Sequence, residues 1–598
     1  MCGIVGYFGF RNAGDVCADG LSRLEYRGYD SFGVAAVSPE KGLSIYKETG
    51  KISVLRNNIK LDGTVGVGHT RWATHGVPCK KNAHPLLDCT GKIAVVHNGI
   101  IENYAELKRG LEKKGHVFAS DTDTEVIPHL IEDAYDGDLF AAVQKILPKL
   151  QGSYAILAVM EGMNGIVAAR KGSPLVIGLG DNEIVFASDV LPISPYTKDV
   201  LYLEDGDAAF AHLSSVGKHA VTVYHNKKPV KRELHTIEFD AEETKKGGFP
   251  HYMLKEIYEQ PEVFSNTVAS IASMREDIIS SFAEAHSVVI TACGTSAHAS
   301  MILAYLLETV CRIPARVILA SEFKYAPTPN TDLVIGVSQS GETADTIAAL
   351  KKAKECGAHT LCITNVLGSS LTRTADTTAY TRGGPEISVA ATKTFLAQTA
   401  AFLEIAVLLS ESLKGRSGTS HSSLQKSIRD VQRYLPEIIA TDVTDAVDVL
   451  KGASSLIYVG RGIGYPAALE GALKIKEISY IHAEGYAAGE LKHGPFALLG
   501  ESVPVVAVCF EDSLTYPVMM SNLKEITARS SPLVLIGSAG DSDAEDLADV
   551  FIPLPKVSET ASAVLASTVM QLIAYRTADE LGCEIDYPKN LAKSVTVE

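Results

Sequence analysis

The chain has 598 residues, of which 46% are hydrophobic and 21% are charged, a composition typical of globular proteins and not of disordered or fibrous ones. Its formal net charge is −16 and it contains no dense cluster of Lys and Arg, so we expect no nucleic-acid partner. At roughly 100–200 residues per domain, the length predicts three or four domains.

The first residues, MCGIVGYFGF, lack the basic region and cleavage site of a signal peptide, and no apolar run reaches the ~18 residues of a membrane span. These features predict a cytoplasmic protein without a membrane partner. The ten cysteines are scattered, without a CxxC pair or zinc-type spacing, so we expect buried thiols and neither disulfides nor a metal site.

The first ~235 residues contain short apolar runs at close spacing, separated by Gly, Asn and Asp turns. This pattern predicts many strands packed sheet on sheet, with helices over Ala105–Lys114 and Thr124–Asp136. The predicted strands are Cys2–Gly9, Gly33–Val37, Val65–His69, Lys92–His97, Tyr154–Val159, Ile166–Ala169 and Glu183–Ala187.

A polar, Gly-rich stretch, Thr244–Pro250, is the best linker candidate. Beyond it, short apolar strands alternate with helical segments, which indicates a parallel α/β sheet. The predicted strands here are Ser287–Thr291, Leu333–Val337 and Thr360–Thr364.

This α/β pattern then repeats with a period of roughly 170 residues. The segment SVVITACGTS from Ser287 resembles SSLIYVGRGIG from Ser454, and TDLVIGVSQSGE from Thr331 matches ESVPVVAVCFED from Glu501. Only the first copy keeps the Ser-rich loop, so we expect one binding half and one partner half. The domain boundaries that we predict are 2–238, a linker at 239–260, 261–435, 436–588 and a tail at 589–598.

Cys2 follows the initiator Met, whose removal would leave a thiol and a free α-amine on one residue. An α-amine has a pKa of about 7.7–8.0 and can accept the thiol proton without a histidine. Six ordered motifs surround this cysteine in the first domain. They are MCGIVGYFG, LEYRGYDSFG, GHTRWATHG, NAHP, HNGIIENY and SDTDTEV.

Together these motifs resemble the glutaminase domain of the N-terminal-nucleophile amidotransferases, which implies a four-layer αββα sandwich. A glutamine substrate presents a carboxylate, which Arg71 can bind with its fork of donors, and an ammonium, which Asp123 can hold. Attack by Cys2 creates an oxyanion, and the resemblance assigns its stabilisation to Asn98 and Gly99. It also implies that Thr74 and His75 line the pocket and that Trp72, the only tryptophan, is a mobile gate.

The loop VSQSGETADT follows the strand from Leu333, and hydroxyl side chains and Gly at a strand-to-helix turn can hold a phosphate. It is not a Walker loop, because GxxxxGK[ST] is absent. With CGTS and GPEISVAATK, the loop resembles the sugar isomerase (SIS) domains, which bind phosphosugars. Carried over by position, the phosphate ligands are Ser296, Ser338, Gln339, Ser340 and Thr343, with Thr295 and Val389 at the sugar.

The second copy places Glu470, Lys474 and Glu477 at i, i+4 and i+7, on one face of an apolar helix. Charged groups on a buried helix need partners or a function. The segments GYAAGELKHGP and NLAKSVTVE complete a resemblance to the family of isomerising glutamine–fructose-6-phosphate transaminases, which spans nearly the whole chain.

The resemblance implies glutamine hydrolysis at Cys2, internal transfer of ammonia, and conversion of fructose 6-phosphate to glucosamine 6-phosphate, the first step of hexosamine synthesis. It gives Schiff-base formation to Lys593, ring opening to His493 of a neighbouring subunit, and the proton shift to Glu477 with Lys474 nearby, while Glu470 and Glu386 are weaker candidates. We expect a homodimer, glutamine and fructose 6-phosphate as partners, and no cofactor or metal.

Three alternatives stay open from the residues alone. An amidotransferase acting on another phosphosugar, or on phosphoribosyl pyrophosphate or aspartate, would share the first domain. A non-catalytic phosphosugar sensor would carry an output domain, and an inactive relative would have lost Cys2, Glu477 or Lys593, all of which are present.

Overall fold

The computed structural model describes residues 2–72, 76–214, 217–237, 245–326, 333–412 and 421–596. Contacts divide the chain into two units, the first Met1–Thr244 with Ala592–Glu598 and the second Lys245–Leu591. The division falls inside the segment 239–260 that we predicted as a linker. Helix α6 (Tyr252–Tyr258) lies in the same segment and belongs to the second unit.

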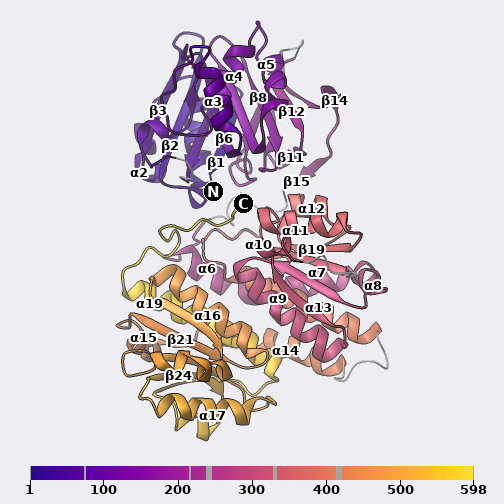
Figure 1. The fold of residues 1–598 in the computed structure, drawn as a ribbon, viewed down its shortest axis with the longest axis vertical. Helices are drawn as coiled ribbons and strands as arrows, with labels where there is room; N and C mark the ends of the chain where they lie inside the picture. The colour runs from indigo at the N-terminus through magenta and orange to yellow at the C-terminus, as the bar shows by residue number, and fades with distance from the viewer. Residues whose placement is uncertain are drawn as a thin grey trace. The chain divides into compact units, whose positions relative to one another are not determined.

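Two antiparallel sheets form the first unit (Figure 1). The eight-stranded sheet has the order β15 (Leu234–Thr236), β11 (Asp199–Tyr202), β9 (Val176–Gly180), β10 (Glu183–Ala187), β1 (Gly3–Phe8), β4 (Val65–Arg71), β2 (Ser31–Ser38) and β3 (Gly42–Thr49). The seven-stranded sheet has the order β14 (Lys228–Val230), β13 (His219–His225), β12 (Asp207–Leu213), β8 (Gly165–Lys171), β7 (Gly152–Met160), β6 (Ile93–Ile101) and β5 (Leu86–Leu87).

The two sheets pack face to face, and helices cover their outer faces. Along β6, Ala94 and Val96 join the core between the sheets, whereas Ile93 and Val95 pack with α4 (Val126–Ala134) and α5 (Leu139–Ile146), as the two-residue period of a strand requires. The other outer face carries α1 (Ala13–Ser22). The predicted four-layer αββα arrangement is therefore confirmed, as are the two predicted helices, observed as α3 (Tyr104–Glu112) and α4.

Glycines in β4 bring α1 close to the sheet. A Cβ at Gly66 would lie 2.9 Å from the Cβ of Ala13, and a Cβ at Gly68 would lie 2.8 Å from Leu21. Val65 and Val67, which alternate with these glycines, face the core between the sheets. This packing fixes the end of β4, where Arg71 and Trp72 follow.

The second unit contains two five-stranded sheets in which every pair of neighbouring strands is parallel. The first has the order β17 (Ala315–Leu319), β16 (Val288–Ala292), β18 (Leu333–Ser338), β19 (His359–Thr364) and β20 (Thr377–Tyr380). The second has the order β22 (His482–Ala487), β21 (Ser455–Gly460), β23 (Val505–Cys509), β24 (Leu533–Ser538) and β25 (Val550–Leu554). The same strand order in both sheets confirms the predicted repeat.

Helices cover both faces of each sheet (Figure 1). One core joins the inner faces of both repeats through α7 (Gln260–Ser273), α9 (Gly294–Leu306), α13 (Lys393–Ser412), α14 (His421–Ile438), α16 (Gly464–Ser479) and α19 (Glu559–Glu580). The outer faces carry α10 (Ala320–Phe323), α11 (Ala344–Glu355) and α12 (Ser370–Thr374) in the first repeat, and α17 (Tyr516–Thr527) and α18 (Ser542–Glu545) in the second. The remaining α-helices of the described residues are α2 (Ile52–Leu55), α8 (Arg275–Phe282) and α15 (Thr444–Leu450).

Helix α13 has the length and hydropathy of a membrane span, but 94% of its apolar window is buried inside the structure. It packs against α7, α9 and α14 and belongs to the shared core. Among the described residues it is the only helix of this kind, and its burial marks it as a core helix of the second unit.

Candidate active sites

Cys2 lies at the start of β1, beside the end of the neighbouring strand β4. The backbone N–H of Trp72 donates a hydrogen bond to the Cys2 Sγ at 3.2 Å. Burial raises the pKa of the Cys2 thiol, while the Trp72 N–H and the Arg71 guanidinium favour the thiolate. The indole ring of Trp72 packs edge-on against Tyr29, with ring centroids 5.7 Å apart.

Asn98 lies on β6 in the facing sheet, and its side chain reaches Cys2. Its Nδ2 donates to the Cys2 carbonyl oxygen at 2.9 Å, and its Oδ1 lies 3.1 Å from the Nε2 of His69. Burial lowers the pKa of His69 to about 3, so this imidazole is neutral. Because the same Nε2 also faces the His97 carbonyl oxygen at 3.0 Å, it is the donor, and it fixes the amide with its NH₂ group toward Cys2.

Gly99 follows Asn98 in a conformation that favours glycine, with φ +125°. A Cβ here would lie 2.1 Å from the carbonyl oxygen of Ser153 on the paired strand β7. The position therefore requires glycine, which allows β6 and β7 to pair closely beside the cysteine.

Two buried charges belong to the same unit. Arg71 is 3% exposed and donates through Nη2 to the Gly76 carbonyl oxygen at 3.0 Å. Burial lowers the pKa of Arg71, and the carboxylates of Asp30 and Asp123 oppose that effect. Asp123 is also buried, and it accepts the backbone N–H of Ile101 at 2.8 Å. Thr74 and His75 lie outside the described residues.

Sequence reasoning assigned no role to three histidines inside the quoted motifs, His69, His84 and His97. His69 and His84 stack with ring centroids 4.1 Å apart, and the N–H of His97 donates to the His84 Nδ1 at 3.3 Å. Burial lowers the pKa of all three. The stacked, neutral rings of His69 and His84 lie behind Asn98, and the occurrence of the three histidines in three successive motifs was the available signal.

In the second unit, the Ser-rich loop follows β18, the strand next to β16. From these two strands the chain continues to opposite sides of the sheet. β16 leads to β17 on one side and β18 leads to β19 on the other, and ligands of open α/β sheets bind at such a switch point. The loop from β18 to α11 is held by its own hydroxyls. The Ser338 Oγ lies 2.9 Å from the Thr343 Oγ1 and accepts the Gly341 N–H at 3.1 Å.

Other predicted phosphate ligands are held by neighbouring elements. Ser296 begins the helix after β16, and its Oγ accepts Nε2 of Gln398, a residue of α13, at 2.9 Å. The Ser340 Oγ accepts the N–H of Glu342 at 3.2 Å, and the Gln339 carbonyl oxygen accepts the N–H of Asn365 at 3.1 Å. Gln398 was missed because its link to Ser296 spans 102 residues.

A buried charged cluster lies where α9 and α16 meet, the helices that follow β16 and β21 in the two repeats. Lys474 lies 3.3 Å from Oε1 of Glu470 and 2.6 Å from Oε2 of Glu477, and it donates to Thr295 Oγ1 at 3.1 Å. Glu470 also accepts the Thr295 hydroxyl at 2.9 Å and pairs with the His298 Nδ1 at 2.8 Å.

The ion pairs in this cluster determine the charge states of Glu470 and Lys474. Burial raises the pKa of Glu470, but Lys474 and His298 lower it more, so the net direction is down. Burial lowers the pKa of Lys474, but Glu470 and Glu477 raise it further, so the ammonium form is held. Of the two carboxylates, only Glu477 reaches solvent, with 20% of its side chain exposed against 1% for Glu470.

Four predicted residues lie elsewhere. His493 is exposed and ends the short 3₁₀ helix Ala488–His493. The Val389 N–H donates to the Asp586 carbonyl oxygen at 3.0 Å. Lys593 belongs to the C-terminal segment that groups with the first unit, in which Ser594 and Thr596 are buried. Glu386 accepts the N–H groups of Thr392 and Thr394 at the start of α13, a capping position.

Both units of the chain are similar to known proteins. A glutamine amidotransferase domain model matches residues 69–194, and a SIS domain model matches residues 281–408 and 449–578. Glutamine–fructose-6-phosphate aminotransferases [isomerizing] of Thermus thermophilus and Aquifex aeolicus are each 44% identical to this chain, over the whole of both chains. The solved C-terminal domain of the Francisella tularensis glucosamine-fructose-6-phosphate aminotransferase is 35% identical, with a TM-score of 0.54, and it matches 57% of this chain and all of that one.

Proposed function

Because the chain belongs to the family of isomerising glutamine–fructose-6-phosphate aminotransferases, we propose how its residues divide that reaction between the two units. The reaction converts glutamine and fructose 6-phosphate to glutamate and glucosamine 6-phosphate. The carrying observation is that one chain holds both sets of side chains: Cys2 with Trp72 and Asn98, and Thr295 with Lys474 and Glu477.

In the glutaminase half, Cys2 becomes the first residue after removal of Met1, and its α-amine takes the thiol proton. The thiolate attacks the carboxamide carbon, and the oxyanion is stabilised by the Asn98 Nδ2 and the Gly99 N–H. The tetrahedral intermediate expels ammonia and leaves a thioester, which water cleaves to glutamate. Arg71 binds the substrate carboxylate and Asp123 its ammonium, while Thr74 and His75 line the pocket.

Trp72 acts as the gate for ammonia. Its backbone N–H bonds the nucleophilic sulfur while its indole rests on Tyr29, so a movement of this residue alters both the gate and the nucleophile. That mechanical link supports the coupling of ammonia release to the sugar site.

In the sugar half, the loop Ser338–Thr343 and Ser296 bind the phosphate, helped by the N-terminus of α11. Thr295 and Val389 contact the sugar. His493 of a neighbouring subunit opens the ring, and Lys593 forms a Schiff base with the C2 ketone. Ammonia then displaces the lysine amine, which leaves an imine at C2.

Glu477 completes the reaction by moving a proton. It removes a proton from C1, the electrons move toward the C2 imine, and a proton is returned at C2, so that the ketose imine becomes an aldose amine. Lys474, held as an ammonium, lies 2.6 Å from the Glu477 carboxylate and positions it for this step.

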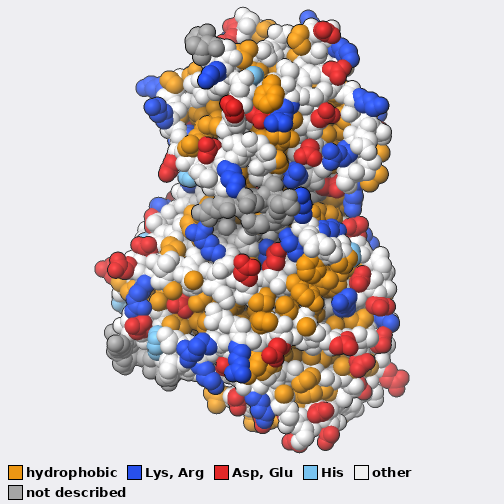
Figure 2. Space-filling view, turned by 180° about the vertical axis from the view of Figure 1, so that it is seen from behind, with side chains coloured by type: hydrophobic (Ala, Val, Ile, Leu, Met, Phe, Trp, Pro, Cys, Tyr) orange, Lys and Arg blue, Asp and Glu red, His pale blue; other side chains and the backbone are white. Residues whose placement is uncertain are grey.

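The assembly is a cytoplasmic homodimer whose partners are its small-molecule substrates. The exposed position of His493 supports a role in a neighbouring site. Large exposed hydrophobic side chains on the second unit also support self-association. They include Tyr325, Leu498, Leu514 and Val518, and Figure 2 shows hydrophobic surface gathered on one face of that unit.

A coupled assay tests the proposal. Purified protein receives glutamine with and without fructose 6-phosphate, and glutamate and glucosamine 6-phosphate are quantified in wild type, Cys2→Ala and Lys593→Arg. We expect equimolar products in wild type, neither product from glutamine in Cys2→Ala, and glutamate alone in Lys593→Arg. Glutamate without amino sugar in wild type would redirect the search to another phosphosugar, and amino sugar from Lys593→Arg would remove that lysine from the mechanism.

A further inference from the structure

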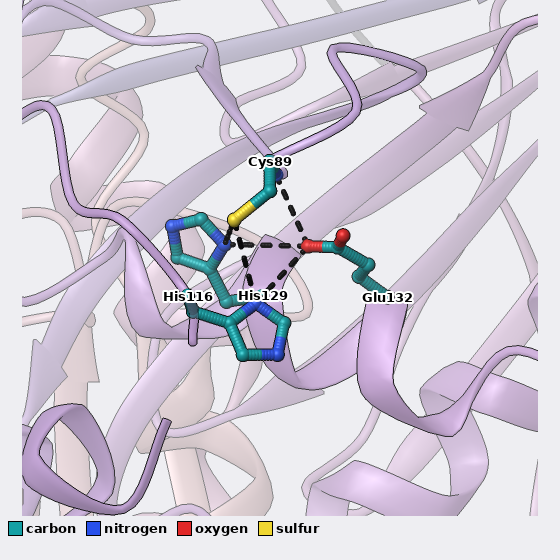
Figure 3. Close-up of side chains that lie close together, drawn as sticks. All are labelled: Cys89, His116, His129 and Glu132. Atoms are coloured by element: carbon teal, nitrogen blue, oxygen red, sulfur yellow. Dashed lines mark hydrogen bonds and ion pairs between the residues drawn. The ribbon is translucent and has the colours of Figure 1, made fainter. Parts of the chain in front are cut away.

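Four side chains in the first unit converge on one point, away from the residues of the proposed reaction. Cys89 lies in the turn between β5 and β6, His116 follows α3, and His129 and Glu132 lie three residues apart on one face of α4. Figure 3 shows the thiol, both imidazoles and the carboxylate turned toward one another. Within the described parts of the chain, this is the one group of its kind.

Four of the six distances between the donor atoms are close to those around a tetrahedral ion, and all six are within 4.8 Å. The Cys89 Sγ lies 3.5 Å from Nδ1 of His116 and 3.4 Å from Nδ1 of His129. Oε2 of Glu132 lies 3.2 Å and 3.5 Å from the same two nitrogen atoms. Zinc–ligand bonds of about 2.0–2.3 Å place neighbouring donors of a tetrahedron about 3.3–3.6 Å apart.

The far side of each imidazole faces a carboxylate. Nε2 of His129 lies 3.5 Å from Oε1 of Glu125, and Nε2 of His116 lies 3.9 Å from Oδ1 of Asp133. A metal-bound imidazole coordinates through one nitrogen and carries its proton on the other, which a carboxylate then orients. Both histidines turn Nδ1 toward the shared centre and Nε2 toward a carboxylate, at ion-pair and not hydrogen-bond distance.

We propose that Cys89, His116, His129 and Glu132 form a structural zinc site. A thiolate, two imidazoles and a carboxylate are donors that Zn²⁺ accepts, and four protein ligands leave no open position for catalysis. The distance in sequence explains why spacing motifs missed it, since Cys89 precedes His116 by 27 residues and His129 by 40. The spacing of the cysteines predicted no metal site anywhere in the chain, and the proposed site departs from that prediction.

The ion would join three elements that lead to the glutamine pocket. Glu125, which orients His129, accepts the N–H groups of Ala119 and Ser120, both at 2.6 Å. These bonds shape the loop that carries Asp123. Loss of the ion would therefore loosen the loop and weaken glutamine binding, a consequence that rests on the proposed function, whereas the site itself does not.

Metal analysis of the full-length protein tests the site. We expect one zinc per chain after growth with zinc, and, once the zinc is exchanged for Co²⁺, a thiolate-to-cobalt charge-transfer band with the strong visible bands of four-coordinate cobalt. Cys89→Ser should lose the charge-transfer band and the bound zinc. Cys356→Ser, which changes another exposed cysteine, should keep both.

Wild-type protein that carries no zinc and gives no cobalt bands would overturn the proposal, and so would Cys89→Ser with wild-type zinc content. A different metal at one per chain on these residues would overturn the choice of zinc. The wild-type measurements need no variant to fold. His116→Gln, which keeps all three other ligands, provides a second test and should lower zinc affinity by at least about 10-fold. None of these readouts depends on enzymatic activity, so they remain decisive if the proposed reaction is wrong.

Discussion

The ammonium of Lys474 lies 2.6 Å from the carboxylate of Glu477, and the lysine is fully buried while the glutamate reaches solvent. The lysine also pairs with Glu470, which is buried with it. One cation therefore serves two carboxylates, of which only Glu477 is open to a substrate. This geometry supports the proposed chemical role of Glu477 and a structural role for Glu470.

Replacing Glu477 with Gln should stop isomerisation and leave glutamine hydrolysis in place, because the amide keeps the shape of the side chain without its basicity. Loss of a general base lowers a rate by about 10²–10⁴-fold. Amino sugar production should fall by that factor, and exchange of the C1 hydrogen of fructose 6-phosphate with deuterated water should fall with it. Exchange at the wild-type rate would exclude Glu477 as the base.

Lys474→Met should destabilise the second unit strongly, since it leaves Glu470 buried without its cation. Removing one partner of a buried pair costs about 3–5 kcal/mol. Lys476→Met on the same helix is the matched control, because Lys476 is exposed and should change the free energy of unfolding by less than about 0.5 kcal/mol. Urea denaturation measures both.

In Lys474→Met, the contribution of Glu470 to the pH dependence of stability should also change sign. In wild type its folded pKa lies below its ordinary value of 4.5, so its contribution is present above pH 4.5 and is lost as the pH falls through the folded pKa. Without Lys474, burial raises the folded pKa above 4.5, and the contribution is then present at low pH and lost as the pH rises through that folded pKa. Unfolding curves that differ between the two proteins by a constant amount at every pH would contradict this account.

Asn98→Ala should lower the kcat of glutamine hydrolysis by about 10²–10³-fold, the effect of removing one oxyanion donor. The KM for glutamine should change little, because Asn98 acts on a charge that exists only during the reaction. Steady-state glutaminase kinetics measure the effects on kcat and KM separately. A large rise in KM with unchanged kcat would make Asn98 a binding residue instead.

Much of this fold could be predicted because its signals are local. Alternating strands, the repeat from Ser287 to Ser454, and three charges at helical spacing on an apolar segment each lie within a short window of sequence. The observed strand orders confirmed the repeat. Asn98 and Gly99 were predicted only from the resemblance of motifs, because local composition does not distinguish them from other residues.

Long-range partners could not be predicted in this way. The Thr295–Glu470 bond joins residues 175 positions apart, and the Gln398–Ser296 bond spans 102. Such pairs arise from the packing of α9 against α16 and α13, which depends on the whole core. The same limit concealed Cys89 and its neighbours, because their turn, the loop after α3 and helix α4 meet only in the folded sandwich.

Gly341→Ala should weaken sugar-phosphate binding, because a Cβ at this position of the Ser-rich loop would lie 2.0 Å from the Ser369 Oγ and its φ is +62°. Gly357→Ala is the matched control, since its φ is +86° and a Cβ there meets nothing within 4 Å. Both variants carry the backbone strain of about 1–2 kcal/mol, but only Gly341→Ala displaces the loop.

The KM for fructose 6-phosphate should therefore rise by at least about 10-fold in Gly341→Ala, which corresponds to about 1.4 kcal/mol of lost binding, and stay near wild type in Gly357→Ala. Glutamine hydrolysis without sugar should be unchanged in both, because Gly341 belongs to the second unit. Equal KM values in the two variants would mean that strain alone governs the loop and that the clash at Ser369 has no effect on the phosphate site.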